Sequence, residues 1–205
     1  MLLGLVTDIH NDHDSLRRAL EKFRACKVEQ VVTIGDSCDA YAPADGADEV
    51  AELLSFCNAV GVWGNHDYVI CNPDNDHSGR GISPATSELM QRMLPSLVVD
   101  GCLFTHRESN LDPNDLEQLW AFAEHRDDFA RQLKSAYAAN QFRRQFIGHY
   151  HQWWAGTPDG PLDWDGSSEL DLSSTARSIV IIGANFQGHC AVYDSELEIL
   201  FPHEV

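Results

Sequence analysis

The chain has 205 residues, of which 43% are hydrophobic and 9% aromatic, a composition that excludes an intrinsically disordered protein and allows a sizeable core. Its formal net charge is −18, from 32 acidic and 14 basic residues. Long nucleic acids and anionic membranes are disfavoured as partners, because binding to either requires Lys and Arg to displace counterions.

The first third of the chain alternates short apolar runs with helical patterns. Residues 1–6 predict a strand, and residues 16–23 carry apolar side chains at helical spacing behind Asp14 or Ser15 as N-cap. Strands are predicted again at residues 31–36 and 59–67, with a helix over residues 50–57 between them. This βαβαβ order is typical of a mostly parallel, layered sheet.

The rest of the chain changes character twice. Helices are predicted over residues 83–94 and from about Pro113 to Asn140, with a short strand at residues 102–106 between them and another strand at residues 143–151 after them. Residues 155–168 are rich in Gly, Pro, Asp and Ser and predict a long surface loop. Residues 177–183, 190–194 and 197–201 then predict closing antiparallel strands.

Targeting signals and metal-binding cysteine pairs are missing from the sequence. No apolar stretch reaches the roughly 20 residues that cross a bilayer, and residues 1–6 lack the basic flank of a signal peptide. The six cysteines include no C-x-x-C pair, which argues against a zinc ribbon and against a disulfide scaffold. We expect one domain over residues 1–205, reduced and mostly buried thiols, a cytoplasmic location and no membrane partner. The oligomeric state is not predicted.

Polar side chains follow the predicted strands at the points where the strands end. Asp8 and His10 stand one residue apart, and alternate residues of a strand share a face, so both can point into one space. Taken alone, an Asp-x-His pair is more often a polar turn. The other strands end in residues of the same kind, namely Asp36, Asn65, His66, Asp67, His106, His149 and His151. Because open α/β sheets gather ligands beside the carboxyl ends of their strands, this repetition predicts a metal site.

As motifs, these residues are D-x-H from Asp8, G-D-x-x-D from Gly35 to Asp39, G-N-H-D from Gly64 to Asp67, a lone His106, and G-H-x-H from Gly148 to His151. The series resembles the calcineurin-like metallophosphoesterase superfamily over residues 8–151. The resemblance implies an α/β fold, a four-layer αββα sandwich of two mixed β-sheets flanked by helices. It also implies a phosphoric ester hydrolase with two divalent metal ions.

The resemblance also implies a ligand set. Asp8, His10, Asp36 and His151 would hold one ion, and Asp36, Asn65, His106 and His149 the other, with Asp36 as the bridge. Two ions about 3.5–4 Å apart need a shared anion, and a bridging hydroxide would then attack phosphorus. Mixed nitrogen and oxygen ligands suit Mn, Fe, Zn, Co or Ni, and the lack of Cys at these positions argues against a thiolate-rich structural zinc.

His66 lies within a motif but is assigned no metal. The resemblance implies that it contacts the phosphate and protonates the leaving alcohol, while Asp67 holds its ring. A carboxylate beside an imidazole stabilises the protonated form, which suits a general acid. His66 and Asp67 are therefore the predicted catalytic residues.

Several positions near the motifs leave two interpretations open. Asp39 either belongs to the site or turns the loop that follows it. Arg80 and Arg107 either bind substrate phosphate or are solvated at the surface. Trp153 and Trp154 either form a hydrophobic wall near His151 or pack into the core.

Two departures from the family's patterns concern the activity: the first disfavours the protein phosphatases, and the second leaves the substrate contacts near one turn open. Ala40 follows Asp39 and Asp67 follows His66, where the protein serine/threonine phosphatases of the superfamily carry Arg and Glu. Small bacterial members often have a Gly-Ser-rich turn where this chain has "IIGANFQGHC". The predicted substrate is a small phosphate ester, a diester or nucleotide-like compound rather than a phosphoprotein or long nucleic acid. The alternatives are a phosphomonoesterase and a non-catalytic metal-binding scaffold, because a fold does not fix a function.

Overall fold

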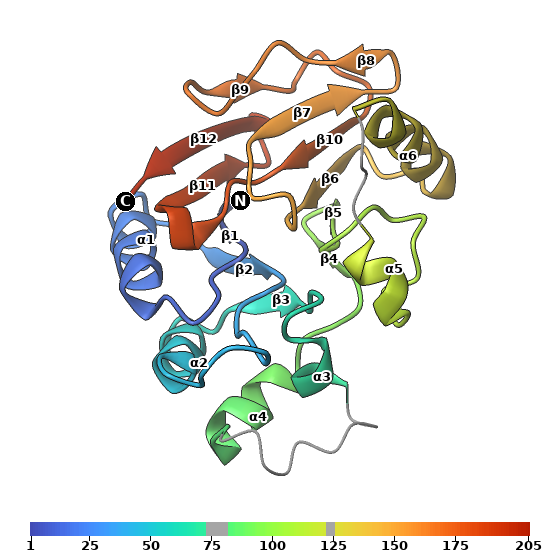
Figure 1. The fold of residues 1–205 in the computed structure, drawn as a ribbon. Helices are drawn as coiled ribbons and strands as arrows, with labels where there is room; N and C mark the ends of the chain where they lie inside the picture. The colour runs from blue at the N-terminus through green and yellow to red at the C-terminus, as the bar shows by residue number, and fades with distance from the viewer. Residues whose placement is uncertain (73–81, 122–125) are drawn as a thin grey trace.

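Two six-stranded sheets form the centre of the protein in a computed structural model, which describes residues 1–72, 82–121 and 126–205 (Figure 1). The first sheet has the order β3 (Val60–Val62), β2 (Gln30–Ile34), β1 (Leu2–Val6), β11 (His189–Asp194), β12 (Ile199–Glu204) and β9 (Leu170–Asp171). The second has the order β4 (Leu97–Val99), β5 (Cys102–Phe104), β6 (Arg144–Ile147), β10 (Ser178–Ile181), β7 (Trp154–Thr157) and β8 (Gly160–Pro161).

Helices flank the two sheets and extend beyond their edges (Figure 1). They are α1 (His13–Ala25), α2 (Ala47–Phe56), α3 (Tyr68–Cys71), α4 (Pro84–Met90), α5 (Leu116–Trp120), α6 (Arg126–Ala139) and the 3-10 helix η1 (Asn185–Gln187). In Figure 1, α1 and α2 lie beside the first sheet and α6 lies beside the second. Both sheets are mixed, because β1 pairs in parallel with β2 and β6 with β10, whereas β1 pairs antiparallel with β11. The predicted αββα sandwich is confirmed.

Three buried layers hold the sandwich together. On β1, Leu3 and Leu5 pack between the sheets, while Val6 faces the helices together with Phe23 of α1. Phe146 of β6 also lies between the sheets, with ring centroids 5.3 Å from Phe104 and 4.9 Å from Tyr193. A third cluster, on the other face of the second sheet, joins Ile147, Ile179 and Ile181 to Leu133, Ala136 and Tyr137 of α6. Strands with both faces covered are apolar throughout, which is why they stand out as continuous runs in the sequence.

Several elements differ from the expectations, and α3, β4 and β9 were not predicted. The N-cap of α1 is Asp12, whose Oδ1 accepts from the Ser15 amide at 2.9 Å, so the helix begins before Asp14 and Ser15. The predicted loop over residues 155–168 contains part of a hairpin, β7 with β8. The predicted helix from Pro113 to Asn140 is two helices, α5 and α6, and residues 122–125 between them lie outside the described residues. Of the closing strands, β10 pairs in parallel with β6 on one side.

All six cysteines are free thiols, four of them buried, as expected. In the described part of the chain, no helix has the length and apolar character needed to cross a membrane.

Candidate metal centre

A left-handed backbone brings the predicted metal ligands together. Five of the seven have positive φ, namely Asp8 (51°), His10 (49°), Asp36 (53°), His149 (70°) and His151 (52°). This conformation is uncommon for residues other than glycine and is concentrated at functional sites. Asp8 and His10 lie beyond the end of β1 at Val6. They therefore converge through a turn and do not share the face of a strand, so the predicted alternation is wrong although the predicted proximity is right.

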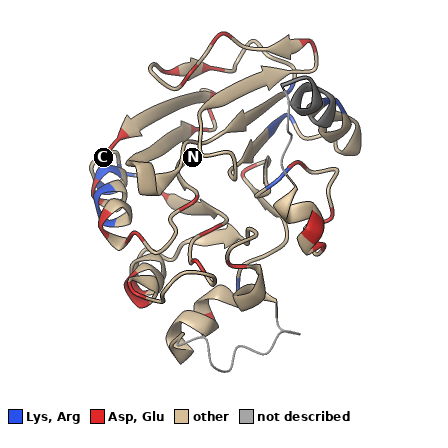
Figure 2. Ribbon diagram, in the orientation of Figure 1, with Lys and Arg blue, Asp and Glu red and all other residues tan. Residues whose placement is uncertain are grey.

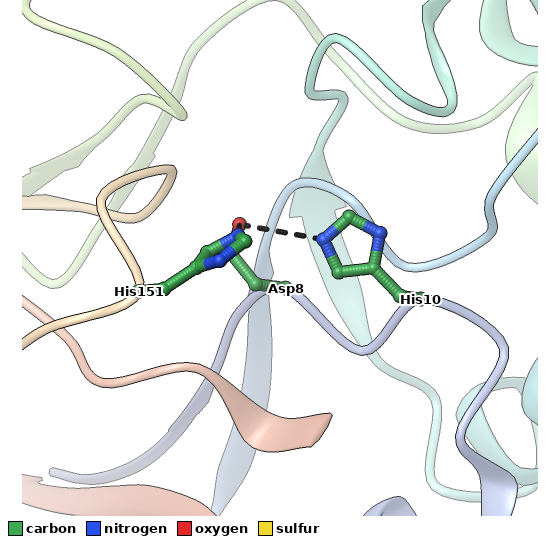
Figure 3. A group of neighbouring side chains, drawn as sticks. All are labelled: Asp8, His10 and His151. Carbon is green, nitrogen blue, oxygen red and sulfur yellow. Dashed lines mark ion pairs between the residues drawn. The ribbon is translucent and has the colours of Figure 1, made fainter. Parts of the chain in front are cut away.

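The first group of ligands is Asp8, His10 and His151, whose ligand atoms all lie within 4.8 Å of one another. Asp8 Oδ1 is 3.3 Å from His151 Nε2 and 4.0 Å from His10 Nε2. Figure 3 shows the Asp8 carboxylate between the two rings, with a dashed ion pair to His10. Asp8 Oδ2 is already used, because it accepts from the Thr7 hydroxyl at 2.8 Å and from the His149 amide at 3.0 Å. These bonds leave Oδ1 for a ligand.

The second group is Asp36, His106 and His149, all of them buried. His106 Nδ1 lies 2.7 Å from the Ile34 carbonyl, which accepts its N–H and so leaves the Nε2 lone pair for a metal. Asn65 joins the group through Oδ1, which is 3.1 Å from His106 Nε2 and 2.9 Å from His149 Nδ1. The donor atoms of this group are all nitrogen and oxygen.

Asp36 lies between the two groups. Its Oδ1 accepts from the His66 amide at 2.8 Å, which fixes the carboxylate. Its Oδ2 is 3.2 Å from His106 Nε2 and 3.8 Å from His10 Nε2. One carboxylate oxygen therefore faces a histidine of each group, which is the position that a bridging ligand requires.

Two glycines of the motifs allow this close approach. A Cβ at Gly64 would lie 2.2 Å from Asp36 Oδ1 and 2.7 Å from His106 Nε2. A Cβ at Gly148 would lie 2.0 Å from the Thr7 hydroxyl and 3.0 Å from Asp8 Oδ2. Any larger residue at either position would displace a ligand.

The chemistry of the donors fits divalent cations. Among the described residues, Asp8 Oδ1 and His10 Nε2 are buried and have no hydrogen-bond partner, which is costly unless an ion occupies the space between them. Burial lowers the pKa of His10 below its usual value despite the nearby Asp36 and Asp8, so the ring is neutral and can bind a metal. Burial opposes charge on His106, but Asp36 raises its pKa to about 9. The buried, negatively charged Asp36 carboxylate thus stabilises a positive charge beside it, which a divalent cation would supply.

The carboxylate beside the His66 ring is Asp39. His66 Nδ1 lies 3.1 Å from Asp39 Oδ1, and His10 Nδ1 lies 3.5 Å from Asp39 Oδ2. Burial favours a higher pKa for Asp39, but the His66 ring and the Tyr41 amide lower that pKa below its usual value, so the carboxylate is ionised at neutral pH. Asp39 therefore lies at ion-pair distance from the rings of both a predicted ligand and the predicted acid.

The expected role of Asp67 in holding that ring is wrong in this structure. Asp67 is fully buried, and its oxygens accept from the Gly64 amide at 2.6 Å and the Ser37 amide at 2.8 Å. It thereby joins the G-D-x-x-D turn to the G-N-H-D turn. Nothing in the sequence distinguishes these two nearby carboxylates, because the choice depends on which one meets backbone amides.

Arg107 follows neither of its two predicted interpretations. It is buried and pairs with Glu108, with Arg107 Nε 3.0 Å from Glu108 Oε2. Its Nη1 donates to the carbonyls of Gln118, at 3.2 Å, Leu119, at 3.1 Å, and Ala121. The guanidinium therefore ties the end of α5 to the strand end that carries His106. Arg80 lies outside the described residues.

The aromatic residue beside His151 is Phe186, at a centroid distance of 5.0 Å. It belongs to η1, in the turn that replaces a Gly-Ser-rich segment, and its amide donates to the Asp8 carbonyl at 3.2 Å. Trp153 packs against Trp164 at 5.7 Å, and Trp154 packs against the cluster under α6. The core interpretation of the tryptophan pair therefore holds.

The site and the fold agree with a known family. A profile described as the calcineurin-like phosphoesterase superfamily domain matches residues 1–162. The chain belongs to this superfamily. No curated protein matches this phosphoesterase.

Solved structures share the fold of this phosphoesterase. A metallophosphoesterase from Sphaerobacter thermophilus has a TM-score of 0.78 at 19% identity, over 100% of this chain and 88% of that one. A novel archaeal phosphodiesterase has a TM-score of 0.55 at 14% identity, over all of both chains. YfcE, a phosphoesterase from E. coli, has a TM-score of 0.53 at 16% identity, again over all of both chains. At these identities the likeness concerns the fold alone.

Because Asp36 lies between the two groups of ligands, we predict that it contributes to metal binding in both. We expect Asp36→Asn to weaken metal binding in both groups by about 100-fold or more, whereas His10→Ala weakens mainly the group of Asp8 and His151. Elemental analysis after dialysis measures the metal content of each variant. Two full equivalents of metal in Asp36→Asn would contradict the bridging position.

Asp39 and Asp67 predict opposite outcomes for the same substitution. Asp39→Asn keeps an oxygen for the Tyr41 amide and removes the charge beside His66, so kcat should fall about 10- to 100-fold with metal content and stability retained. Asp67→Asn sets an NH₂ group against one of two buried amides and should destabilise the fold by about 1–3 kcal/mol. Measurements of kcat and of urea denaturation distinguish the two variants. An equal loss of stability in both would refute the different roles given to Asp39 and Asp67.

Proposed function

We propose that this phosphoesterase hydrolyses a small phosphodiester or nucleotide-like ester with two divalent cations drawn from Mn, Fe, Zn, Co or Ni. The observation that carries the proposal is the Asp39–His66 pair beside the ligands, since a protein that only stores metal needs no such pair. The ring centroids of His66 and His10 are 4.5 Å apart. A group bound at the ligands is therefore within reach of an imidazole that a carboxylate orients.

The two groups of ligands would hold the cations on either side of Asp36. When bound, such cations activate a water molecule at neutral pH and neutralise charge that develops on phosphoryl oxygens. The protein's own residues supply the rest. Thr7 and the backbone amides of His149 and His66 keep the Asp8 and Asp36 carboxylates in place. Little reorganisation is then needed during the reaction.

His66 provides the proton for the leaving group. Its Nδ1 faces Asp39, so Nε2 is the atom that can donate to a substrate. Hydrolysis forms one P–O bond to the oxygen of the attacking water, which gives up a proton to solvent, and breaks the P–O bond to the alcohol, whose oxygen receives the Nε2 proton. Solvent then returns a proton to Nε2. Asp39, 3.1 Å from Nδ1, keeps the ring in the same orientation before and after the transfer.

The charges favour a diester over a monoester. Arg107 neutralises Glu108 and donates to carbonyls, so it offers no charge to a second phosphate oxygen. A diester carries one negative charge, whereas a monoester carries close to two at neutral pH. Figure 2 shows Asp and Glu spread over many loops and helices, with Lys and Arg on α1 and at a few places near β6 and α6. Such a surface also disfavours long nucleic acids.

A panel of phosphate esters tests the proposed function. We expect metal-dependent hydrolysis of bis(p-nitrophenyl) phosphate to exceed hydrolysis of p-nitrophenyl phosphate and of phosphopeptides, in protein loaded with two equivalents of metal. Exclusive turnover of monoesters would instead support a phosphomonoesterase. Full metal loading without hydrolysis of any ester would support the non-catalytic scaffold.

The role of His66 predicts a dependence on the leaving group. His66→Gln should keep both metals and lower kcat by about 10²- to 10⁴-fold, the usual contribution of a positioned acid. The loss should be smaller for p-nitrophenolate, which leaves easily without a proton, than for an alkyl alcohol of high pKa. If the loss were the same for both leaving groups at unchanged metal content, His66 would bind phosphate without acting as the acid.

A further inference from the structure

Exposed aromatic side chains are concentrated at the edge of the metal centre. Among the described residues, eight large hydrophobic side chains are exposed, and the aromatic ones are Tyr41, Phe56, Trp120 and Phe186. All except Phe56 lie against a histidine of the site. Exposed apolar groups that gather at one place indicate a binding surface, whereas scattered ones do not.

Tyr41 and Trp120 form a corner on the His66 side, which we call the aromatic corner. The Trp120 ring lies 4.7 Å from the His66 ring, and the Tyr41 ring lies 6.0 Å from it. The two rings are 5.6 Å apart, with an interplanar angle of 71°. Tyr41 is 52% exposed and Trp120 is 36% exposed, so both present ring surface to solvent. A flat group can stack on one ring while the other ring covers its edge.

Two residues next to the metal motifs hold the aromatic corner in place. Arg107 donates to carbonyls on both sides of Trp120 and is itself fixed by Glu108. Asp39 Oδ1 accepts from the Tyr41 amide at 2.9 Å and also lies beside the His66 ring. The aromatic corner is thus connected through Asp39 to the predicted acid, His66, and through Arg107 to the strand end that carries His106. A chance contact of two surface side chains would not need a buried ion pair and a carboxylate to position it.

We propose that the aromatic corner binds the flat base of a nucleotide ester whose phosphate lies at the metal ligands. The proposal rests on the proposed function and names its substrate class. The His66 ring lies between the ligand His10 and Trp120, with centroid distances of 4.5 Å to the His10 ring and 4.7 Å to the Trp120 ring. A ribose spans an interval of this order between a phosphate and a base. Tyr and Trp also carry a polar O–H and N–H that can reach the heteroatoms of a base.

Stacking on the aromatic corner is expected to act on affinity more than on chemistry. The base is remote from phosphorus, so its contacts are the same in the bound substrate and in the transition state. Loss of the corner should therefore raise KM for a nucleotide ester while kcat stays within a small factor. This pattern differs from that of His66→Gln, where kcat falls.

Two ligands that differ only by the base test the proposal. Adenosine 5′-monophosphate and ribose 5-phosphate share phosphate and sugar, and calorimetric titration into the Mn²⁺-loaded protein measures the affinity of each, with released phosphate assayed so that any turnover is detected. We expect wild type to bind the nucleotide about 5- to 100-fold more tightly, the usual range for one base–aromatic stack. Trp120→Ala and Tyr41→Ala should reduce this ratio toward one, while Trp120→Phe retains most of it.

Phe56→Ala is the matched control, because it removes an exposed ring, 89% accessible, at the last position of α2. It should leave the affinity ratio unchanged. The proposal that the aromatic corner binds a base would be overturned if wild type bound the two ligands equally. It would also be overturned if Trp120→Ala, folded normally by circular dichroism, kept the wild-type affinity ratio. If wild type hydrolyses phosphodiesters in that case, the proposed function stands and only the substrate class fails.

Discussion

The site depends on a backbone constraint, namely the left-handed turns in which the strands end. Each such residue costs of the order of 1–3 kcal/mol unless surrounding structure holds it. Here the turns support one another, because the amides of Ile9 and His10 both donate to the Asp36 carbonyl, at 2.8 Å and 3.0 Å, and the Asp8 amide donates to the Gly35 carbonyl at 3.0 Å. The apolar strands behind these turns are buried on both faces. The packing of these strands in the core of the sandwich therefore offsets the conformational cost of the left-handed turns.

The same turns explain which parts of the site could be predicted. The polar residues at the strand ends were sufficient to predict the candidate ligands that the fold brings close together, because few other arrangements place Asp, Asn and His after one apolar run after another. The role of Asp39 was left open and the role of Asp67 was misassigned, because Asp67 meets the amides of Ser37 and Gly64, whose positions depend on the fold. Likewise, the sequence predicts that Arg107 follows a strand end, but not that Glu108 neutralises it there.

The fold was predicted where periodicity is strong and missed where composition misleads. The βαβ units at the start follow from apolar runs and helical spacing. The hairpin of β7 and β8 was hidden by Gly, Pro and Asp, which are frequent in loops and also form its turn. The parallel pairing of β10 with β6 joins segments on either side of that hairpin, and no local pattern reports such a partner.

The place of β1 in the first sheet has a consequence for synthesis of the protein. β1 lies between β2 and β11, and Leu2 pairs with Asp194. At about 5–20 residues per second, a ribosome delivers β11 roughly 10–40 s after β1, so one edge of β1 waits for its partner with unpaired amides. An open strand edge is a place where another chain can add. The order of the strands in the first sheet therefore leaves this edge of β1 exposed for most of the time that synthesis takes.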